Sequence, residues 1–475
     1  MSRLPSIPGP SHRVGIALAF SFLMADVAFL MADVDAAGPS PTDSGGQPPS
    51  IVLILADDLG YADLGCYGAT DARTPHIDSL ARDGCRFTNF YAMGPQCTPS
   101  RTALLTGRYP QRAGGLECAI GTGNVGRYDE AIELAGRGEL GLPPEQAVLA
   151  PALQSRGYVT AIFGKWHLGY DSQFNPLDQG FDEFAGFLGG NVEYFRHYEL
   201  SDLDVFLRGR EPVDREGYLT DLISDDAVDF LQRQAETPDR PFFLYLPHAA
   251  PHFPFQGPED RDPEPTAETW MTGTRESYVA MVESLDRGVG RVLRTLDEIG
   301  RTENTIVIFT SDHGAMPPGR NTPWRDFKST LFEGGIRVPF LVRWPGRFPP
   351  GGESRHVGTL MDLTQSLLRI AGAAVPDGGG LDGIDILGEV LSGRPPGDRE
   401  LYWRYRRGDL TWRAVRAGDS KLIVRQSGNQ VETWLFDLGR DPTETRNLAA
   451  TRVGERDRLA EMLRRWELAT VPVRP

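Results

Sequence analysis

The chain has 475 residues, 40% of them hydrophobic and 24% charged, which are ordinary values for a folded protein with room for one large domain and a smaller one. Its formal net charge of −16 at pH 7 argues against nucleic acid or an anionic membrane surface as the main partner. A negatively charged substrate would therefore need a local positive pocket to overcome the field of the whole protein.

The N-terminus is predicted to direct export. Residues 1–37 combine a basic start with the apolar run 14–25, which has the length of a signal core, and 34–36 offers small residues for cleavage. This run is too short to cross a bilayer as a helix, so we expect no stable membrane span and a periplasmic or secreted protein. Acidic residues interrupt the segment. The alternative interpretation is therefore a disordered tail that results from a misplaced start codon. Residues 38–49, rich in Pro, Gly and Ser, are expected to form a flexible leader.

The main domain is predicted at 50–377, where apolar strands alternate with helices. The expected strands are 51–55, 159–163, 242–246, 305–309 and 338–342, and the expected helices are 74–84, 219–234 and 277–299. This order predicts an α/β fold in which a large parallel or mixed sheet is flanked by helices on both faces.

A smaller C-terminal subdomain is predicted at 378–475. Residues 401–435 alternate like strands and a helix is expected at about 453–468, so we expect an antiparallel sheet with one helix packed on the main body. The arginines and aromatic residues of 403–407 and 412–413 could line a groove for an anionic sugar. They could equally form a solvated strand face on which arginines spread over aromatic rings.

Charged side chains follow four of the predicted strands. They are, in chain order, Asp57, Asp58, Lys165, His167, His248, His252, Asp312 and His313. Ligands of open α/β sheets bind at the carboxyl ends of the strands, so neighbouring strands would bring these groups to one place. Only three of the 49 lysine and arginine residues are lysines, yet Lys165 and Lys328 lie in or beside these segments. A compact ammonium group can bind a single oxygen, whereas the planar guanidinium group is wider. The two lysines therefore indicate that the geometry of the site requires a compact cation.

Three of these groups are hard carboxylate ligands. Asp57, Asp58 and Asp312, with His313 as a further ligand, suit a divalent cation that prefers oxygen, calcium first and magnesium second. The alternative is mutual repulsion that is relieved by protonation or by arginines.

The most informative stretch is Cys97-Thr98-Pro99-Ser100-Arg101. Thr98 is a good N-cap and Pro99 suits the first helical position, so a helix is expected that stops at Gly107. Cys97 would then lie at an anion-binding helix end, with Arg101 on the same side. A small nucleophile beside a fixed cation indicates chemistry on a phosphate or sulfate group, and a buried cysteine at a helix start is the alternative.

The other cysteines are Cys66, Cys85 and Cys118. Cys66 and Cys85 could form a disulfide, although a buried free thiol is expected for at least one of the three. No Cys/His spacing indicates zinc.

Residues 97–101 resemble the sulfatase signature C-x-P-S-R. Residues 157–169, GYVTAIFGKWHLG, match the second signature of that family, and the match continues through Lys328 and 333–339, EGGIRVP. These motifs follow the family's order from about residue 50 to 345. The chain thus resembles sulfatases of the arylsulfatase type, which implies an alkaline-phosphatase-like fold, a catalytic domain at 50–377 and a sulfuric ester hydrolase that acts on aryl or carbohydrate sulfates.

The resemblance also implies the parts of the site. It implies a formylglycine made from Cys97 by a maturation enzyme, and a calcium ion bound by that residue with Asp57, Asp58, Asp312 and His313. Arg101 is expected to hold residue 97 in position. The substrate is expected to contact Lys165, His252 and Lys328.

Proton transfers are assigned to histidines by the same resemblance. His252, in a His-x-Pro context, is the expected general acid, assisted by Lys328, and His248 is its rival. His167 is the expected base.

Two rival functions stay open. One is a phosphonate or phosphodiester hydrolase with the same nucleophile, and the other is a binding protein with an unmodified cysteine. The natural substrate is also open, because loops 117–145 and 186–210 would shape the pocket, with Asn191, Tyr194 and His197 as guesses for its wall.

Overall fold

The computed structural model describes residues 47–121, 128–200, 206–374 and 380–470. The predicted signal at 1–37, most of the leader and the boundary at 377/378 lie outside these ranges.

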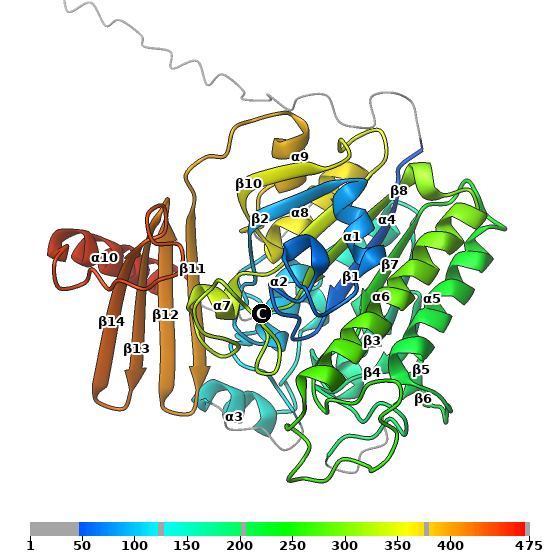
Figure 1. The fold of residues 1–475 in the computed structure, drawn as a ribbon, viewed down its shortest axis with the longest axis horizontal. Coiled ribbons are helices and arrows are strands. Elements are labelled where there is room, and N and C mark those ends of the chain that lie inside the picture. The colour runs from blue at the N-terminus through cyan, green and yellow to red at the C-terminus, as the bar shows by residue number, and fades with distance from the viewer. Residues whose placement is uncertain (1–46, 122–127, 201–205, 375–379, 471–475) are drawn as a thin grey trace, which may run out of the picture. The chain divides into compact units, whose positions relative to one another are not determined.

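The larger sheet has ten strands in the order β10-β2-β9-β8-β1-β7-β3-β4-β5-β6 (Figure 1). Its central strands β8, β1, β7, β3 and β4 run parallel, whereas β9 is antiparallel to both β8 and β2, so the sheet is mixed, as predicted. The strands are β1 (Ser50–Ala56), β2 (Cys85–Tyr91), β3 (Val159–Lys165), β4 (Glu183–Phe187), β5 (Leu207–Arg208), β6 (Glu211–Pro212), β7 (Phe242–Pro247), β8 (Thr305–Ser311), β9 (Phe340–Arg343) and β10 (Gly352–Thr359).

Helices cover both faces of this sheet. Alternate residues of β1 explain why, because Val52 and Ile54 pack with one set of helices while Ile51, Leu53 and Leu55 pack with another. The first set is α1 (Pro75–Arg82), α5 (Leu219–Gln234) and α6 (Arg275–Glu298). The second set is α2 (Cys97–Thr106), α4 (Leu149–Ser155), α8 (Leu360–Ala371) and α9 (Ile386–Leu391). Burial on both faces is the reason that the central strands are apolar throughout.

The smaller sheet is a four-stranded antiparallel meander, which confirms the predicted architecture. The strands of this sheet are β11 (Glu400–Arg407), β12 (Leu410–Ala417), β13 (Ser420–Ser427) and β14 (Gln430–Asp437), and the helix α10 (Val453–Ala469) follows them. Two short helices, α3 (Asp129–Gly136) and α7 (Glu333–Ile336), come from the main part of the chain.

The aromatic and basic stretch of β11 serves packing. Trp403 is buried and its indole N–H donates to the carbonyl of Ala92 at 2.8 Å. Arg404 and Arg406 both pair with the buried carboxylate of Glu117, at 2.7 and 2.8 Å. These arginines therefore join the small sheet to the main part of the chain, and neither lies spread in solvent on an open strand face.

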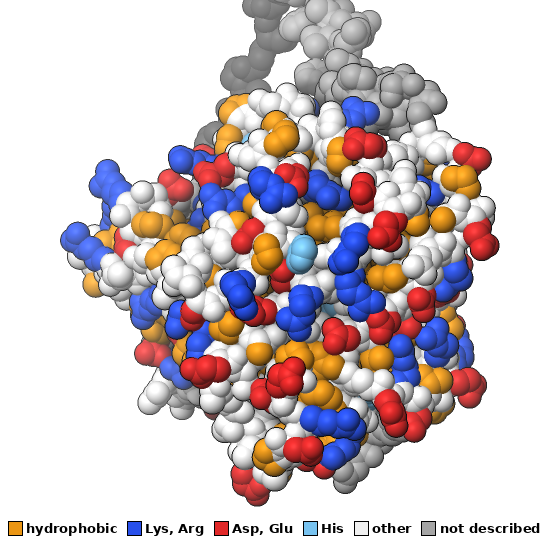
Figure 2. All heavy atoms as spheres, turned by 45° about the vertical axis from the view of Figure 1, so that its right-hand side comes forward, with side chains coloured by type: hydrophobic (Ala, Val, Ile, Leu, Met, Phe, Trp, Pro, Cys, Tyr) orange, Lys and Arg blue, Asp and Glu red, His pale blue; other side chains and the backbone are white. Residues whose placement is uncertain are grey.

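Two further predictions concern cysteines and membranes. All four cysteines are free thiols, so the Cys66–Cys85 disulfide does not form. Among the helices of the described ranges, none is both long and apolar enough to cross a bilayer. On the face shown in Figure 2, basic and acidic side chains are interspersed, without a broad field of one sign.

Candidate active site

The predicted polar groups meet at the carboxyl ends of adjacent strands. Strands β8, β1, β7 and β3 are consecutive neighbours in the sheet, so the segments that follow them share one edge. Helix α2 brings Cys97 to the same place, and the loop before α7 brings Lys328.

Cys97 lies in the centre of this group. Its sulfur is 3.2 Å from Asp57 Oδ1, 3.3 Å from Lys165 Nζ and 3.3 Å from His313 Nε2. Burial alone would raise the pKa of the Cys97 thiol, but the charges of Lys165, Lys328 and His313 hold that pKa well below its usual value.

The start of α2 differs from the prediction. Gln96 is the N-cap and Cys97 is already the first helical residue, so Thr98 is not the cap. The Thr98 hydroxyl instead donates to the carbonyl of His167 at 3.0 Å and accepts from the N–H of Ile120 at 3.2 Å. The preference of threonine for the N-cap position is not realised, because the hydroxyl of Thr98 binds residues that are distant in the sequence.

Arg101 is fully buried beneath the acidic groups. Its Nε and one terminal nitrogen lie 3.3 and 3.2 Å from Asp312 Oδ2, and the other terminal nitrogen donates to the carbonyl of Lys165 at 2.9 Å. The guanidinium thus fixes the carboxylate after β8 and the end of β3 in one geometry.

Two overlapping sets of side chains could hold a cation. The first is Asp57, Asp58, Cys97 and His252, and the second is Asp57, Cys97, Asp312 and His313, with all ligand atoms of each set within 4.8 Å of one another. Burial, followed by the charge of Asp57, raises the pKa of Asp312 well above its ordinary value. Half of the donors in each set are carboxylate oxygens, and a buried cluster in which one acid resists ionisation fits a divalent cation.

His313 presents its ring to this cluster. Its Nδ1 lies 3.0 Å from the carbonyl of Gly314, which leaves Nε2 facing Asp58 Oδ1 at 3.3 Å and Cys97. Burial opposes protonation, but the charges of Asp312, Cys97 and Asp58 raise the pKa of His313 to about 9.

Lys328, Asp58 and His252 form a second part of the site. Lys328 Nζ is 2.7 and 2.8 Å from the two oxygens of Asp58 and 3.1 Å from His252 Nε2. The Nδ1 of His252 lies 2.8 Å from the carbonyl of Phe253 and donates to it, so Nε2 is the ring nitrogen that faces Lys328. His248 belongs to neither candidate cation set, and burial lowers its pKa to about 3.

His167 is oriented by one backbone carbonyl. Its Nε2 lies 2.7 Å from the oxygen of Ile120, which makes Nε2 the donor and leaves a lone pair on Nδ1, and Cys97 is a hydrogen-bonding neighbour of this side chain. Burial and the charge of Lys165 lower the pKa of His167 to about 4. The ring is therefore neutral at pH 7 and Nδ1 can accept a proton.

Strained backbone occurs at two of these residues. Asp58 has φ 62° and His167 has φ 60°, both in the left-handed region that favours glycine. Such conformations persist only where surrounding contacts determine them, and they occur often at functional sites.

The three residues that were guesses for the pocket wall contact other parts of the chain or are buried. Tyr194 donates to the carbonyl of His252 at 3.0 Å, and Asn191 accepts from the indole N–H of Trp270 at 2.8 Å. His197 is buried. Sequence reasoning missed a buried cluster formed by Lys421, Glu333 and Glu444, although Lys421 is the third of only three lysines and was therefore visible as a signal.

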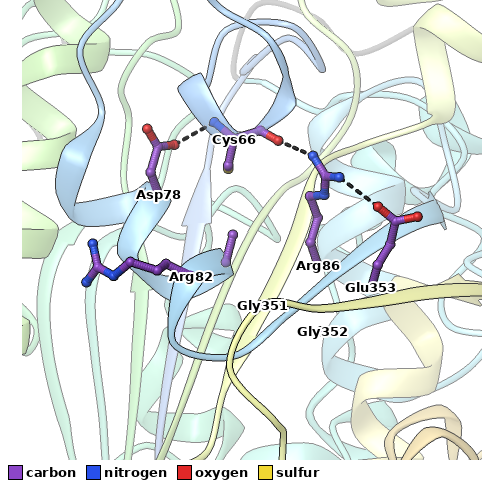
Figure 3. Close-up of a pocket in the computed structure, with 8 residues that line it drawn as sticks. Cys66, Asp78, Arg82, Arg86, Gly351, Gly352 and Glu353 are labelled. Carbon is purple, nitrogen blue, oxygen red and sulfur yellow. Dashed lines mark hydrogen bonds and ion pairs between the residues drawn. The ribbon is translucent and has the colours of Figure 1, made fainter.

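A separate pocket of about 350 Å³ is lined by none of the predicted catalytic, metal-binding or substrate-binding residues (Figure 3). There the N–H of Cys66 donates to Asp78, the Cys66 carbonyl accepts from Arg86, and Arg86 pairs with Glu353. Burial and the charge of Asp78 raise the pKa of the Cys66 thiol, which makes it a poor nucleophile.

Comparison with known proteins identifies relatives over most of the chain. A family model described as sulfatase matches residues 49–373, and one described as the C-terminal region of N-sulphoglucosamine sulphohydrolase matches 322–467. N-acetylgalactosamine-6-sulfatase of Canis lupus familiaris is 37% identical over 79% of this chain and 71% of its own length. Arylsulfatase A of Homo sapiens is 32% identical over 89% of this chain and 87% of its own length.

Solved structures share the fold. Ps i-CgsB in complex with k-i-k-neocarrahexaose has a TM-score of 0.77 at 31% identity, and the match covers 88% of this chain and 93% of that one. The phosphonate monoester hydrolase of Agrobacterium radiobacter has a TM-score of 0.63 at 20% identity over 89% of this chain and 96% of that one, a likeness of fold alone.

Proposed function

Because this chain belongs to the sulfatase family and is a sulfuric ester hydrolase, we propose that it cleaves aryl or carbohydrate sulfate esters with a calcium-assisted formylglycine made from Cys97. The observation that carries this proposal is the buried contact of the Cys97 sulfur with Asp57, Lys165 and His313. This contact supports the proposal because it would bring a nucleophile, a cation and an ammonium group to one point.

The cation would be held by oxygen-rich ligands. Asp57, Asp58, Asp312 and His313 would bind calcium, with magnesium as the second choice, and the ion would neutralise sulfate oxygens and lower the pKa of a hydroxyl at residue 97. Lys165 pairs with Asp57 and Lys328 pairs with Asp58, and both lysines would bind the remaining sulfate oxygens as charge moves in the transition state.

The modified residue has a specific chemical use. A hydrated aldehyde supplies two hydroxyls on one carbon, so that one can attack sulfur and the other can re-form the carbonyl and release sulfate without attack of water on sulfur. Arg101 keeps the surrounding frame in place, because it binds Asp312 and the end of β3 at once.

Two histidines would move the protons. The alcohol leaves when its bond to sulfur breaks, and the proton that it needs is delivered from the His252–Lys328 pair, whose nitrogens are 3.1 Å apart. His167 would take the proton of the second hydroxyl on Nδ1, since its pKa of about 4 keeps that nitrogen unprotonated near neutral pH.

The substrate class follows from the relatives, as a proposal. Similar proteins are named N-acetylgalactosamine-6-sulfatase, and one solved relative is a complex with k-i-k-neocarrahexaose. We expect a sulfated saccharide or small aryl sulfate as the substrate, a formylglycine-generating enzyme as the maturation partner, and export through residues 1–37.

The test joins mass spectrometry with a choice of substrates. The full chain is produced with a maturation enzyme, the peptide that contains residue 97 is weighed, and turnover of an aryl sulfate is compared with that of an aryl phosphonate. We expect the mass of formylglycine and a preference for the sulfate. An unconverted thiol in material from a competent host favours a binding protein, and a preference for the phosphonate favours the rival hydrolase.

A further inference from the structure

Lys421 lies in a second buried cluster of charges, outside the candidate active site. Its Nζ is 2.7 Å from Glu333 Oε1 and 2.8 Å from Glu444 Oε1, and none of the three side chains is exposed to solvent. Breaking such a pair leaves an uncompensated buried charge, which is strongly unfavourable. Lys421 is on β13 of the small sheet, whereas Glu333 opens α7, so this cluster ties the two parts together.

Glu333 is held from several sides. Its Oε2 accepts from the Tyr91 hydroxyl at 2.7 Å and from Arg337 at 3.1 Å, and its own N–H donates to Glu444 Oε2 at 2.6 Å. The first residue of α7 therefore has a fixed position and a fixed orientation.

Helix α7 in turn supports the residues of the site through backbone contacts. The N–H of Gly314, which directly follows His313, donates to the carbonyl of Gly335 at 3.1 Å. A Cβ on Gly314 would come within 1.8 Å of the carbonyl oxygen of Gly334, so the two backbones approach as closely as glycine allows.

The other side of α7 supports the loop of Lys328. The N–H of Gly334 donates to the carbonyl of Arg325 at 2.8 Å, and the N–H of Lys328 donates to that of Ala315 at 3.2 Å. A Cβ on Gly335 would meet the carbonyl oxygen of Thr330 at 2.1 Å. A displacement of α7 would therefore move the loop of Lys328 and the turn of His313 together.

We infer that Lys421 is a positioning residue for the reaction, which acts through Glu333 and α7 on Lys328 and His313. This inference rests on the proposed function for the roles of those two residues. It also explains why a chain rich in arginine has a lysine at this position. The compact ammonium group fits between two buried carboxylates, which the wider guanidinium group of arginine would push apart.

The experiment compares Lys421→Met and Lys421→Arg with the matched control Arg399→Met. Arg399 also joins the start of the small sheet to the main part of the chain, and its hydrogen bonds go to the buried Asp362 and to the carbonyl of Val357. Aryl sulfate turnover, melting temperature and formylglycine content are measured on the full, matured chain. Hydrogen–deuterium exchange is followed in peptides that cover 313–336.

We expect Lys421→Met to lower kcat about tenfold or more with formylglycine content unchanged, because small misplacements of catalytic groups are costly. Lys421→Arg should recover part of kcat, and Arg399→Met should lower the melting temperature while kcat stays within about twofold. Exchange in 313–336 should rise in Lys421→Met and not in the control.

Unchanged exchange in 313–336 and an unchanged kcat in Lys421→Met would overturn the inference. If Lys421→Met fails to fold, hydrogen–deuterium exchange in 313–336 of Lys421→Arg and Glu444→Gln tests the inference instead. A parent protein without sulfatase activity would contradict the proposed function alone, since the exchange comparison needs no turnover.

Discussion

Asp312 and Glu333 are both completely buried carboxylates, yet their pKa values move in opposite directions. At Asp312, burial and the charge of Asp57 raise the pKa well above its ordinary value. At Glu333, burial acts the same way, but Lys421 and Arg337 outweigh it and lower the pKa to about 2. Glu333 contacts two cations, Lys421 and Arg337, whereas Asp312 shares the guanidinium of Arg101 with the neighbouring Asp57. We therefore expect the cluster around Glu333 to serve stability and the acids around Cys97 to bind a cation.

The strongest test of this contrast is removal of the charge at Asp312. Asp312→Asn should lower turnover of an aryl sulfate by about 10³-fold, or roughly 4 kcal/mol, because it takes away a cation ligand and the partner of Arg101. Steady-state kinetics and urea unfolding of the calcium-free protein are the measurements. A loss of stability larger than that of Glu333→Gln would contradict the contrast.

The next effect is expected in the structural cluster. Glu333→Gln leaves Lys421 and Arg337 with less compensation in a buried place, and we expect a loss of about 3–4 kcal/mol in the free energy of unfolding. Urea denaturation gives this value. A variant as stable as the parent would show that the cluster is not a structural clamp.

His248 extends the comparison to a buried group without a charged partner. Burial lowers its pKa to about 3, so the unfolded chain binds the proton that the folded chain refuses. The stability that it contributes is therefore present above about pH 6.5 and is lost as pH falls, by roughly 3 kcal/mol at pH 4. His248→Asn should flatten the pH dependence of stability in this range. The control substitution is His76→Asn, at an exposed position.

Calcium should stabilise one cluster and not the other. At a concentration 100 times its dissociation constant, an ion that binds only the folded state adds about 2.7 kcal/mol. We expect the melting temperature of the parent and of Glu333→Gln to rise with calcium and to fall with a chelator. Asp312→Asn should respond weakly, and an equal response in all three proteins would place the ion elsewhere.

Sequence reasoning succeeded where burial imposes a simple pattern. The central strands were predictable because both of their faces are covered, and α5 was predicted with its observed bounds, 219–234, from its apolar spacing. The convergence of the polar residues was predictable because each of four consecutive strands of the sheet is followed by charged or histidine side chains.

The misses come from contacts between distant parts of the sequence. Thr98 has the preference of a cap but binds His167 and Ile120, and Arg404 and Arg406 look free in the sequence but pair with Glu117. The partnership of Lys421 with Glu333 joins positions 88 residues apart, and no local periodicity reports such a pair.

The left-handed backbone at Asp58 and His167 has a consequence for mutagenesis. Alanine at either position would remove the functional group, but its Cβ would still disfavour the left-handed conformation. An alanine variant would therefore combine the loss of the functional group with the conformational strain of the backbone. Asparagine tolerates this region better and glycine adopts it freely. Substitution by both, at each position, would separate the contribution of the side chain from that of the main chain.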